Sequence, residues 1–524
     1  MSENSNTDKH AAATGTGIIG SAFTERGMNA EIDELVNSIA RLYLEDLTPW
    51  VVGYSGGKDS TACLQLIWLA LQRIEKENRK KNVYVVTNDT LVENPVVQHW
   101  VKRSHEAMRA QAEYDDLPVI PEMLTPIVGE TFWVNLIGRG YPAPNRRFRW
   151  CTERMKIHPT TRFIRSLVNQ TGEAIIVLGA RKAESASRAA RIKKYEATEV
   201  RENLSPHNDL PSALVYKPIV DWSNDDVWMF LMQYSNPWNF NNKDLLTMYR
   251  SATADEECPL VIDTSTPSCG NSRFGCWTCT VVEKDKSMSA MIQNSEERQW
   301  MLPLLELRNE LAEASRETRD FRRLNGKVSI YNGENVPGPY TQKTRAYWLT
   351  KVLQAQTWVR ENGPTEVRDI DLISIQEIQE IRRIWIEDKH EHEDLLPEIF
   401  ETETGFSFPH DNFKDLFPLD AEDLMILKRE TSTDLQYELL RELVSVEHTY
   451  RSRTRRTGLF ESFDKAFDRS GWENPEEAIS QMKIVSSANS EASKGNLSEY
   501  NELLNEVSVN TNESASEDTT DASS

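Results

Sequence analysis

This sequence contains no long apolar run, few cysteines, and fewer basic than acidic residues. No stretch approaches the roughly 20 apolar residues of a membrane-spanning helix, and the first residues, MSENSNTDKH, contain no apolar signal core. Six cysteines in 524 residues are too few for a disulfide scaffold. The 60 Lys and Arg residues face 82 Asp and Glu, a net charge of -22. These features predict a cytoplasmic protein with no membrane partner, which needs a local basic patch or a basic helper protein to bind nucleic acid.

The sequence does contain enough apolar residues for several cores. Hydrophobic residues make up 39% and charged residues 27%, which excludes wholesale disorder. At roughly 150 residues per domain, the length favours about three domains. Apolar runs predict strands, with helical periodicity around them, at 50–53, 83–87, 173–179 and 216–220. Alternating strands and helices predict an α/β fold with a parallel sheet and crossover helices.

The second half of the chain has a different pattern. After about residue 285 there is no convincing strand, and long amphipathic stretches predict a mostly helical domain; they are 298–314, 344–361, 374–387 and 434–446. From about residue 485 the chain is rich in Ser, Asn and Glu, which is typical of a disordered acidic tail. His390 and His392 lie in a charged stretch that predicts a solvated helix rather than a metal pair.

The strongest motif is the sequence SGGKDS at 55–60, between the first predicted strand and its helix. Two glycines let backbone amides approach a polyphosphate, and a helix beginning near Ser60 directs its positive end at the anion. The serines add hydroxyl donors and Lys58 adds a positive charge. Asp59 repels phosphates unless it holds a metal ion or caps the turn. The motif predicts a nucleotide site made by Ser55, Gly56, Gly57, Lys58, Asp59 and Ser60.

The spacing of this loop differs from the GxxxxGK[ST] loop of kinases and GTPases. It resembles the loop of the ATP pyrophosphatase superfamily (the PP-loop), whose members cleave ATP between the α- and β-phosphates. Later segments resemble the PAPS reductase-like branch of that superfamily, in the family's order, over roughly residues 48–232. They are RWCT at 149–152 with Lys156 and Pro159, GARKAES at 179–185 with Arg188, and KPI, DW and DVW within 217–228.

The charges of the second segment favour a functional role. Arg181, Arg188 and Lys156 can neutralise phosphates or a departing pyrophosphate, and Glu184 can hold Arg188 or a magnesium ion. For the third segment a structural interpretation is favoured. Ser223 there is a good helix cap, Asp226 stands three residues on, and Trp228 is expected in the core.

Four of the six cysteines crowd into one short segment, with the spacing C-x10-C-x6-C-x2-C. Four thiolates in one loop-like segment can surround a tetrahedral zinc ion or a [4Fe–4S] cluster. The irregular first two spacings favour the cluster over a zinc ribbon. The four cysteines are Cys258, Cys269, Cys276 and Cys279.

Cys151 stands apart in the RWCT segment, among several arginines. Neighbouring cations lower a thiol pKa, which suits a nucleophile or a sulfur carrier. The alternative is a cysteine packed at a helix start against Trp150. Cys63, beside Leu64, is expected to be a small core residue.

The combination of this loop, these segments and the cysteine cluster resembles the DndC-type sulfurtransferases of bacterial DNA phosphorothioation, up to about residue 470. The resemblance implies that ATP activates a DNA backbone phosphate by adenylylation and that sulfur from a cysteine desulfurase replaces a non-bridging oxygen. It implies a [4Fe–4S] cluster on the four clustered cysteines, and Mg²⁺ that shares negative charge with Lys58. The expected catalytic residues are Lys58, Asp59, Cys151 and Arg181, and ATP is also expected to contact Glu184 and Arg188.

This interpretation divides the chain into five expected segments. They are a flexible arm (1–25), a PAPS reductase-like PP-loop domain (26–250), a four-cysteine segment (251–285), a helical domain (286–484) and a disordered acidic tail (485–524). Partner subunits are expected to present the DNA, and other phosphorothioation proteins are expected as partners. The basic stretches 139–156 and 181–194 are candidates to bind AMP, pyrophosphate or the DNA backbone. The stretch 451–456 is a candidate for a distant phosphate contact or for docking an acidic partner, and an exposed solubilising turn is an equal alternative.

Three alternatives stay open. A PAPS or APS reductase of sulfate assimilation carries similar motifs, but such enzymes are shorter and end in a catalytic cysteine motif, and no cysteine follows Cys279 here. A tRNA thiolase uses the same loop, yet no RNA-binding module is evident. A non-catalytic scaffold is disfavoured by the intact Lys58, Asp59 and Ser60.

Overall fold

The structure, a computed structural model, describes residues 20–197, 200–252, 275–409, 418–451 and 453–493. The chain divides into two compact units. The first comprises residues 1–126, 152–277 and 285–299, and the second comprises residues 127–151, 278–284 and 300–524. Residues 127–151 therefore belong to the second unit, although the sequence analysis placed them within 26–250.

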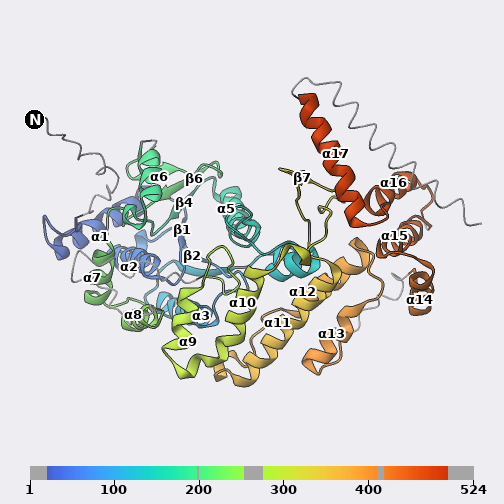
Figure 1. The fold of residues 1–524 in the computed structure, drawn as a ribbon. Coiled ribbons are helices and arrows are strands. Elements are labelled where there is room, and N and C mark those ends of the chain that lie inside the picture. Colours follow the sequence, from blue (N-terminus) through green and yellow to red (C-terminus); the bar gives the residue numbers. More distant parts are fainter. Residues whose placement is uncertain (1–19, 198–199, 253–274, 410–417, 452, 494–524) are drawn as a thin grey trace, which may run out of the picture. The chain divides into compact units, whose positions relative to one another are not determined.

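A six-stranded sheet forms the centre of the first unit (Figure 1). Its order is β3-β2-β1-β4-β6-β5, and every neighbouring pair is parallel except β5 and β6. The strands are β1 (Trp50–Gly53), β2 (Val83–Asn88), β3 (Val119–Leu124), β4 (Ala174–Val177), β5 (Leu204–Pro206) and β6 (Ala213–Tyr216). The predicted α/β fold with a mostly parallel sheet is confirmed.

The strands differ in how well the sequence predicted them. β1, β2 and β4 lie where the apolar runs predicted them. The run at 216–220 was misplaced, because β6 ends at Tyr216 and the residues after it form a turn. β3 was not predicted; it contains Pro121, and proline is tolerated there because β3 is at the edge of the sheet.

Helices cover both faces of the sheet, because the side chains along each strand point alternately to the two faces and apolar ones are buried on both. Val52, Val85 and Val177 belong to the larger core, which most helices of the unit share, whereas Val51 and Ile176 belong to a smaller core with α5. The helices are α1 (Met28–Leu44), α2 (Lys58–Arg73), α3 (Pro95–Tyr114), α5 (His158–Thr171), α6 (Ala186–Glu196), α7 (Asn224–Gln233), α8 (Asn242–Ser251) and α9 (Lys286–Gln293).

The second unit is mainly helical, as the amphipathic stretches predicted. Its helices are α10 (Leu302–Glu313), α11 (Gln342–Asn362), α12 (Ile375–Arg383), α13 (Leu395–Thr404), α14 (Ala421–Glu430), α15 (Asp434–Arg451), α16 (Leu459–Ser470) and α17 (Pro475–Ser493). A two-stranded hairpin, β7 (Ile330–Tyr331) with β8 (Glu334–Asn335), is an unpredicted exception to the helical pattern. Helix α17 also continues nine residues into the segment predicted as a disordered tail.

The prediction of a solvated helix around His390 and His392 is wrong. After the π-helical turn Ile384–Asp388, residues 389–394 form a non-helical loop, with a left-handed φ of 56° at His390. The His392 side chain is buried and its Nε2 lies 2.6 Å from Ser445 Oγ. Glu391 is also buried, in an ion pair with Arg345. The charges of this loop are satisfied by partners distant in the sequence rather than by water.

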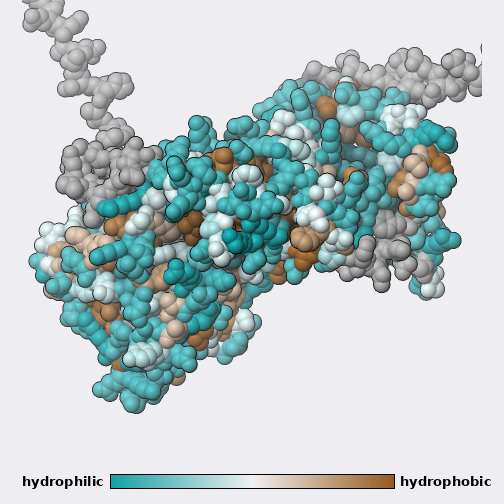
Figure 2. All heavy atoms as spheres, turned by 90° about the horizontal axis from the view of Figure 1, so that it is seen from below, coloured by the Kyte–Doolittle hydropathy of each residue, from teal (hydrophilic) through white to brown (hydrophobic). Residues whose placement is uncertain are grey.

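The surface agrees with the charged composition. Figure 2 shows a face on which hydrophilic residues predominate and hydrophobic residues gather in small patches. Among the residues that the structure describes, no helix is long and apolar enough to cross a membrane.

Candidate nucleotide site

The SGGKDS loop lies where the connections of the sheet reverse direction. β1 stands between β2 and β4; the chain runs outward from β1 through β2 to β3 and then returns to β4 on the other side of β1. In open parallel sheets, ligands bind outside the carboxyl ends of the strands at such a point. The loops that follow β1 and β4 both leave this edge, so the topology brings residues 54–57 and 178–184 together.

Two glycines shape the loop after β1. Gly56 has a φ of +72°, and a Cβ there would lie 2.5 Å from Val101 Cγ2, so only glycine fits. Helix α2 begins at Lys58, two residues earlier than predicted, and its cap residue Gly57 has no side chain to block the approach of an anion. The Ser60 hydroxyl donates to Gly57 O (3.0 Å) and lies 3.1 Å from Ser55 Oγ. The two serine hydroxyls therefore contact each other within the loop.

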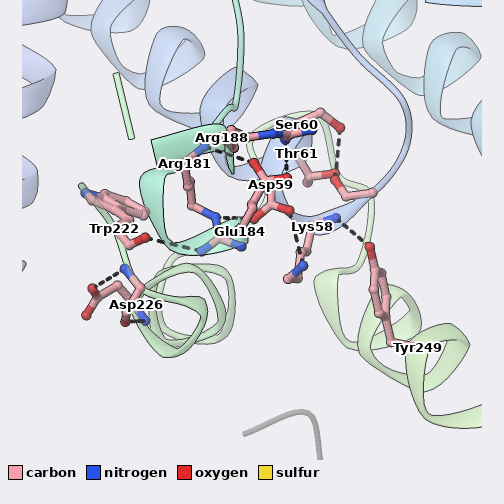
Figure 3. A network of polar contacts seen from close by, with 12 residues as sticks. Lys58, Asp59, Ser60, Thr61, Arg181, Glu184, Arg188, Trp222, Asp226 and Tyr249 are labelled. Atoms are coloured by element: carbon pink, nitrogen blue, oxygen red, sulfur yellow. Dashed lines mark hydrogen bonds and ion pairs between the residues drawn. The ribbon is translucent and has the colours of Figure 1, made fainter. Parts of the chain in front are cut away.

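The cationic partners of Asp59 account for a carboxylate beside a phosphate loop (Figure 3). Its Oδ1 accepts a hydrogen bond from Arg181 Nε at 2.7 Å, and its Oδ2 lies 3.1 Å from Lys58 Nζ. The Arg181 side chain is only 4% exposed, whereas those of Lys58 and Asp59 are 13% and 24% exposed. The carboxylate thus neutralises a buried guanidinium and remains partly open to an incoming ligand.

Arg181 is fixed from three sides. Besides Asp59, its Nη1 donates to Trp222 O at 3.2 Å, and its backbone amide donates to Glu184 Oε1 at 2.9 Å. The other carboxylate oxygen of Glu184 pairs with Arg188. Glu184 therefore holds Arg188, one of the two roles expected for it. The sequence-predicted residues Asp59, Arg181, Glu184 and Arg188 form one connected network.

Gly179 allows the close approach that this network needs. A Cβ on Gly179 would lie 2.6 Å from Asp59 O and 3.1 Å from Ser60 N, both backbone atoms of the first turn of α2. The chain leaving β4 can therefore pass directly against the amino end of α2. The glycine of the GARKAES segment is thus required by packing as well as by its place in a motif.

Tyr249, on α8, is a site residue that the sequence analysis missed. Its Oη accepts a hydrogen bond from the Lys58 amide at 3.3 Å, and Lys58 Nζ lies 5.5 Å from the centre of its ring. Burial raises the pKa of Tyr249, and the negative charge of Asp59 adds to that effect. No local pattern around residue 249 signals this role, because it depends on the packing of α8 beside the loop.

The structural interpretation of the third motif segment is confirmed. Asp226 is fully buried; its carboxylate accepts from the Ser223 amide at 2.8 Å and its own amide donates to Ser223 Oγ at 3.1 Å, which makes a capping box for α7. Ser21 Oγ also donates to it, at 2.5 Å. Trp228 is buried in the larger core.

Cys276 lies beside the loop that follows β2. Its Sγ is 3.3 Å from Thr90 Oγ1 and 3.7 Å from Glu93 Oε1, and Glu93 also pairs with Lys156 Nζ at 3.7 Å. A backbone bridge joins residues 93 and 276. The structure therefore places one clustered cysteine and the predicted cation Lys156 around the same carboxylate, on a loop at the carboxyl end of a strand next to β1.

The predicted ligand set is only partly within the described chain. Cys258 and Cys269 lie outside it, and the described residues contain no group of three metal-ligating side chains. In the second unit, the Cys279 carbonyl accepts from the buried Arg308 Nε at 2.9 Å. Arg308 also binds the carbonyls of Val282 and Glu283. One side chain thus organises the backbone from Cys279 to Glu283.

The other two cysteines differ in environment. Cys63 is fully buried in the core of the first unit, and burial raises the pKa of its thiol, as expected for a packing residue. Cys151 is half-buried at the edge of the second unit, next to Trp150, whose ring stacks on Phe132 at 5.4 Å. Trp150 Nε1 donates to Pro142 O.

Comparison with known proteins bears on this site. Residues 49–282 match the phosphoadenosine phosphosulfate (PAPS) reductase domain family. The match agrees with the PAPS reductase-like domain predicted from the motifs over 48–232, and the matched range also includes the positions of the four clustered cysteines.

Two individual proteins are similar to parts of the chain. An uncharacterised protein of Methanocaldococcus jannaschii is 29% identical over 204 residues, which is 39% of this chain and 35% of that protein. The chain therefore covers about a third of the length of this relative. The crystal structure of the PAPS reductase of Candida auris, in a phosphate complex, aligns with 44% of this chain and 95% of its own, at 13% identity and a TM-score of 0.26.

Proposed function

We propose that this protein is the ATP-dependent sulfurtransferase of a bacterial DNA phosphorothioation system. The observation that carries the proposal is the Asp59–Arg181 pair beside the SGGKDS loop, at the switch point of a sheet that matches the PAPS reductase domain family. The four clustered cysteines and the long helical half, which resemble the DndC-type proteins, support it further.

ATP suits the residues at this loop. The glycine turn and the uncapped start of α2 present backbone dipoles to a polyphosphate, and Lys58 and Arg181 add two cations. Asp59 is the carboxylate nearest to these cations and is partly exposed, so it would hold Mg²⁺. Bound Mg²⁺ would neutralise charge on the departing pyrophosphate.

The proposed reaction has two displacements. A non-bridging oxygen of a DNA phosphate attacks the α-phosphorus of ATP, and pyrophosphate leaves toward Lys58 and Arg181. A cysteine desulfurase supplies sulfur as a persulfide, whose terminal sulfur then attacks the adenylylated DNA phosphorus while AMP leaves with the oxygen. Two electrons from an external dithiol reductant cleave the remaining S–S bond, which leaves the phosphorothioate on the DNA. Adenylylation is needed because a phosphate oxygen is otherwise a very poor leaving group.

The sulfur is proposed to reach the site through cysteines of this chain. Cys151 is one candidate carrier. A [4Fe–4S] cluster on Cys258, Cys269, Cys276 and Cys279 would supply electrons or bind the sulfur when present. Partner subunits and other phosphorothioation proteins are proposed to present the DNA.

A second candidate is favoured by the same family match. A PAPS or APS reductase-like enzyme would use this site to bind a sulfonucleotide instead of ATP. A tRNA thiolase would use it to adenylylate RNA. The three candidates differ in which product contains the sulfur (DNA, tRNA or sulfite), so identifying that product distinguishes them.

The experiment is mass spectrometry of nuclease-digested cellular DNA, with the unsubstituted gene and with Lys58→Ala. A matched control is Lys80→Ala, which removes an exposed lysine elsewhere in the first unit. We expect sulfur-containing dinucleotides with the unsubstituted gene and the control, and their loss with Lys58→Ala. Their absence throughout, together with changes in thiolated tRNA or in sulfite production, would replace the proposal by one of the alternatives.

A further inference from the structure

Positive charge is concentrated in one part of this acidic chain. Residues 152–194 contain ten Lys and Arg against three Asp and Glu, a net charge of +7, while the other residues together carry -29. All 43 of these residues belong to the first unit. They form α5, β4 and α6, so the basic segment includes the Arg181 network of the nucleotide site.

Several of these cations already have anionic partners. Lys156 pairs with Glu93, Arg181 with Asp59, and Lys182 with Asp221 and Glu196. Arg188 pairs with Glu184. These side chains stabilise the fold or the site and are not available to a macromolecular ligand.

The exposed cations of α6 are different. Arg191, Lys193 and Lys194 are exposed, and none of them makes an ion pair with any residue that the structure describes. Ile192 is buried between them, so the helix is anchored while these three cations face water. Arg191 and Lys194, three positions apart, are neighbours on the helix surface and repel each other, a cost that a bound polyanion would remove.

Helix α6 is joined to the nucleotide site by the Arg181 network. Glu184 binds the Arg181 amide through one oxygen and Arg188, in the first turn of α6, through the other. At the other end, Glu196 pairs with Lys182, the neighbour of Arg181. Both ends of the helix are therefore tied to the residues next to Arg181, which holds α6 in a fixed position relative to the site.

We propose that α6 is the docking surface for the phosphate backbone of the DNA substrate, with Arg191, Lys193 and Lys194 as its phosphate contacts. This inference rests on the proposed function, because it takes DNA as the substrate of the same site. The three cations lie within one turn of α6, and Arg191 and Lys194 are about 4.5 Å apart along its axis. Long side chains from one turn can reach two or three neighbouring phosphates of one strand, which rise about 3.4 Å each along the duplex axis. Contacts of this kind position the strand without reading its sequence.

The test uses the full chain and a variant in which Arg191, Lys193 and Lys194 are all replaced by Gln, which keeps helix propensity. The control replaces Lys80, Lys102 and Lys243 by Gln; these lysines are exposed, lie outside α6, and change the net charge equally. Binding of fluorescent 20-nucleotide DNA, single-stranded and duplex, is measured by anisotropy over a series of salt concentrations. Thermal unfolding and ATP binding are measured in parallel.

We expect the α6 variant to bind DNA at least tenfold more weakly at about 0.1 M salt. The slope of log K against log salt should become shallower by about 2 for single strands or about 3 for duplex, because binding through three fewer phosphate contacts releases fewer counterions. The control should match the unsubstituted chain. Equal weakening in both variants, no weakening in either, or no binding by the unsubstituted chain would overturn the inference. Weakening seen with tRNA and not with DNA would overturn it too.

The two proposals fail in different experiments. If cellular DNA contains no sulfur but α6 still governs DNA binding, the proposed function is wrong and the docking surface remains. If DNA sulfur depends on Lys58 but the α6 variant binds and modifies DNA normally, the docking surface is wrong and the proposed function remains.

Discussion

Asp59 Oδ1 and Arg181 Nε lie 2.7 Å apart, although 122 positions separate the two residues in the sequence. The pair joins the first turn of α2, which follows the loop after β1, to the loop after β4; β1 and β4 are neighbouring strands at the switch point of the sheet. Because the Arg181 side chain is almost completely buried, the pair both stabilises this edge and fixes a cation next to the phosphate loop.

Removing either partner of this pair should cost nearly as much stability as removing both. Asp59→Ala leaves a buried guanidinium without its carboxylate, and we expect a loss of about 3 kcal/mol in the free energy of unfolding. Arg181→Ala should be of similar size, and the double variant should cost less than the sum. Urea unfolding and ATP turnover are the measurements. Arg201→Ala, which breaks ion pairs with Asp46 and Glu173, is the control. Strictly additive losses would contradict a direct coupling.

Gly179→Ala should disturb both stability and ATP binding. The added Cβ would lie 2.6 Å from a backbone oxygen, so the chain after β4 has to move away from α2. Such overpacking costs about 1–3 kcal/mol. Gly20→Ala adds the same methyl group where no atom lies within 4 Å. Thermal unfolding midpoints and ATP titrations of the two variants give the comparison, and equal midpoints would show that this approach is not tight.

Tyr249→Phe should weaken ATP binding with little effect on folding. The variant keeps the ring beside Lys58 and loses only the hydrogen bond from the Lys58 amide to the hydroxyl. One such bond contributes about 1 kcal/mol to stability; because it holds the Lys58 amide in place at the loop, its loss should cost at most that amount, about fivefold, in ATP affinity. Calorimetric titration with ATP measures it, with the exposed Tyr114→Phe as the control. An unchanged affinity would remove Tyr249 from the site.

Stability should fall when the pH is lowered from about 6.5 toward 4. Burial, with the positive charge of Arg109 adding to it, lowers the pKa of His105 to about 4. Nε2 of His105 bonds Thr87, and its buried Nδ1 has no hydrogen-bond partner among the described residues. The unfolded chain therefore binds a proton in this range that the folded chain does not, so stability rises with pH there, by about 3 kcal/mol at most.

The variant His105→Gln should flatten this pH dependence. Unfolding free energies measured by urea between pH 4 and 7 should change less in the variant than in the unsubstituted chain. The exposed His448→Gln should retain the original slope. The buried His392, whose pKa burial also lowers to about 4, should contribute in the same direction. An identical slope in His105→Gln would contradict the argument.

Iron content should separate the roles of the cysteines. Cys276→Ser should reduce the iron of anaerobically purified protein, because it removes one of four proposed ligands. Cys63→Ala, at a buried packing position, should retain it. Cys151→Ser should retain iron and lose sulfur transfer if Cys151 carries the sulfur. Elemental analysis and visible absorbance provide the measurements, and full iron in Cys276→Ser would exclude it as a ligand.

Much of the site could be predicted from local sequence. The apolar runs of β1, β2 and β4, each ended by polar or glycine-rich residues, specify strands and loops, since buried parallel strands need continuous apolar residues. Gly56, Lys58 and Arg181 stood out because their types at that spacing serve phosphate chemistry. The amphipathic periods of the second half likewise predicted its helices. Where the local signal was weak, as in β3 with its proline, the prediction failed.

The sequence by itself therefore determined the sheet class, the phosphate loop and the residues around it, because these follow from short-range periodicity and from the conformational freedom of glycine. Only the tertiary structure decided which of those residues meet. It paired Asp59 with Arg181, brought Tyr249 to Lys58 and Cys276 to Glu93, and buried His392, which its charged neighbours had suggested was solvated. These outcomes depend on contacts between segments far apart in the chain, and the burial that sets their energies is not encoded in any local pattern.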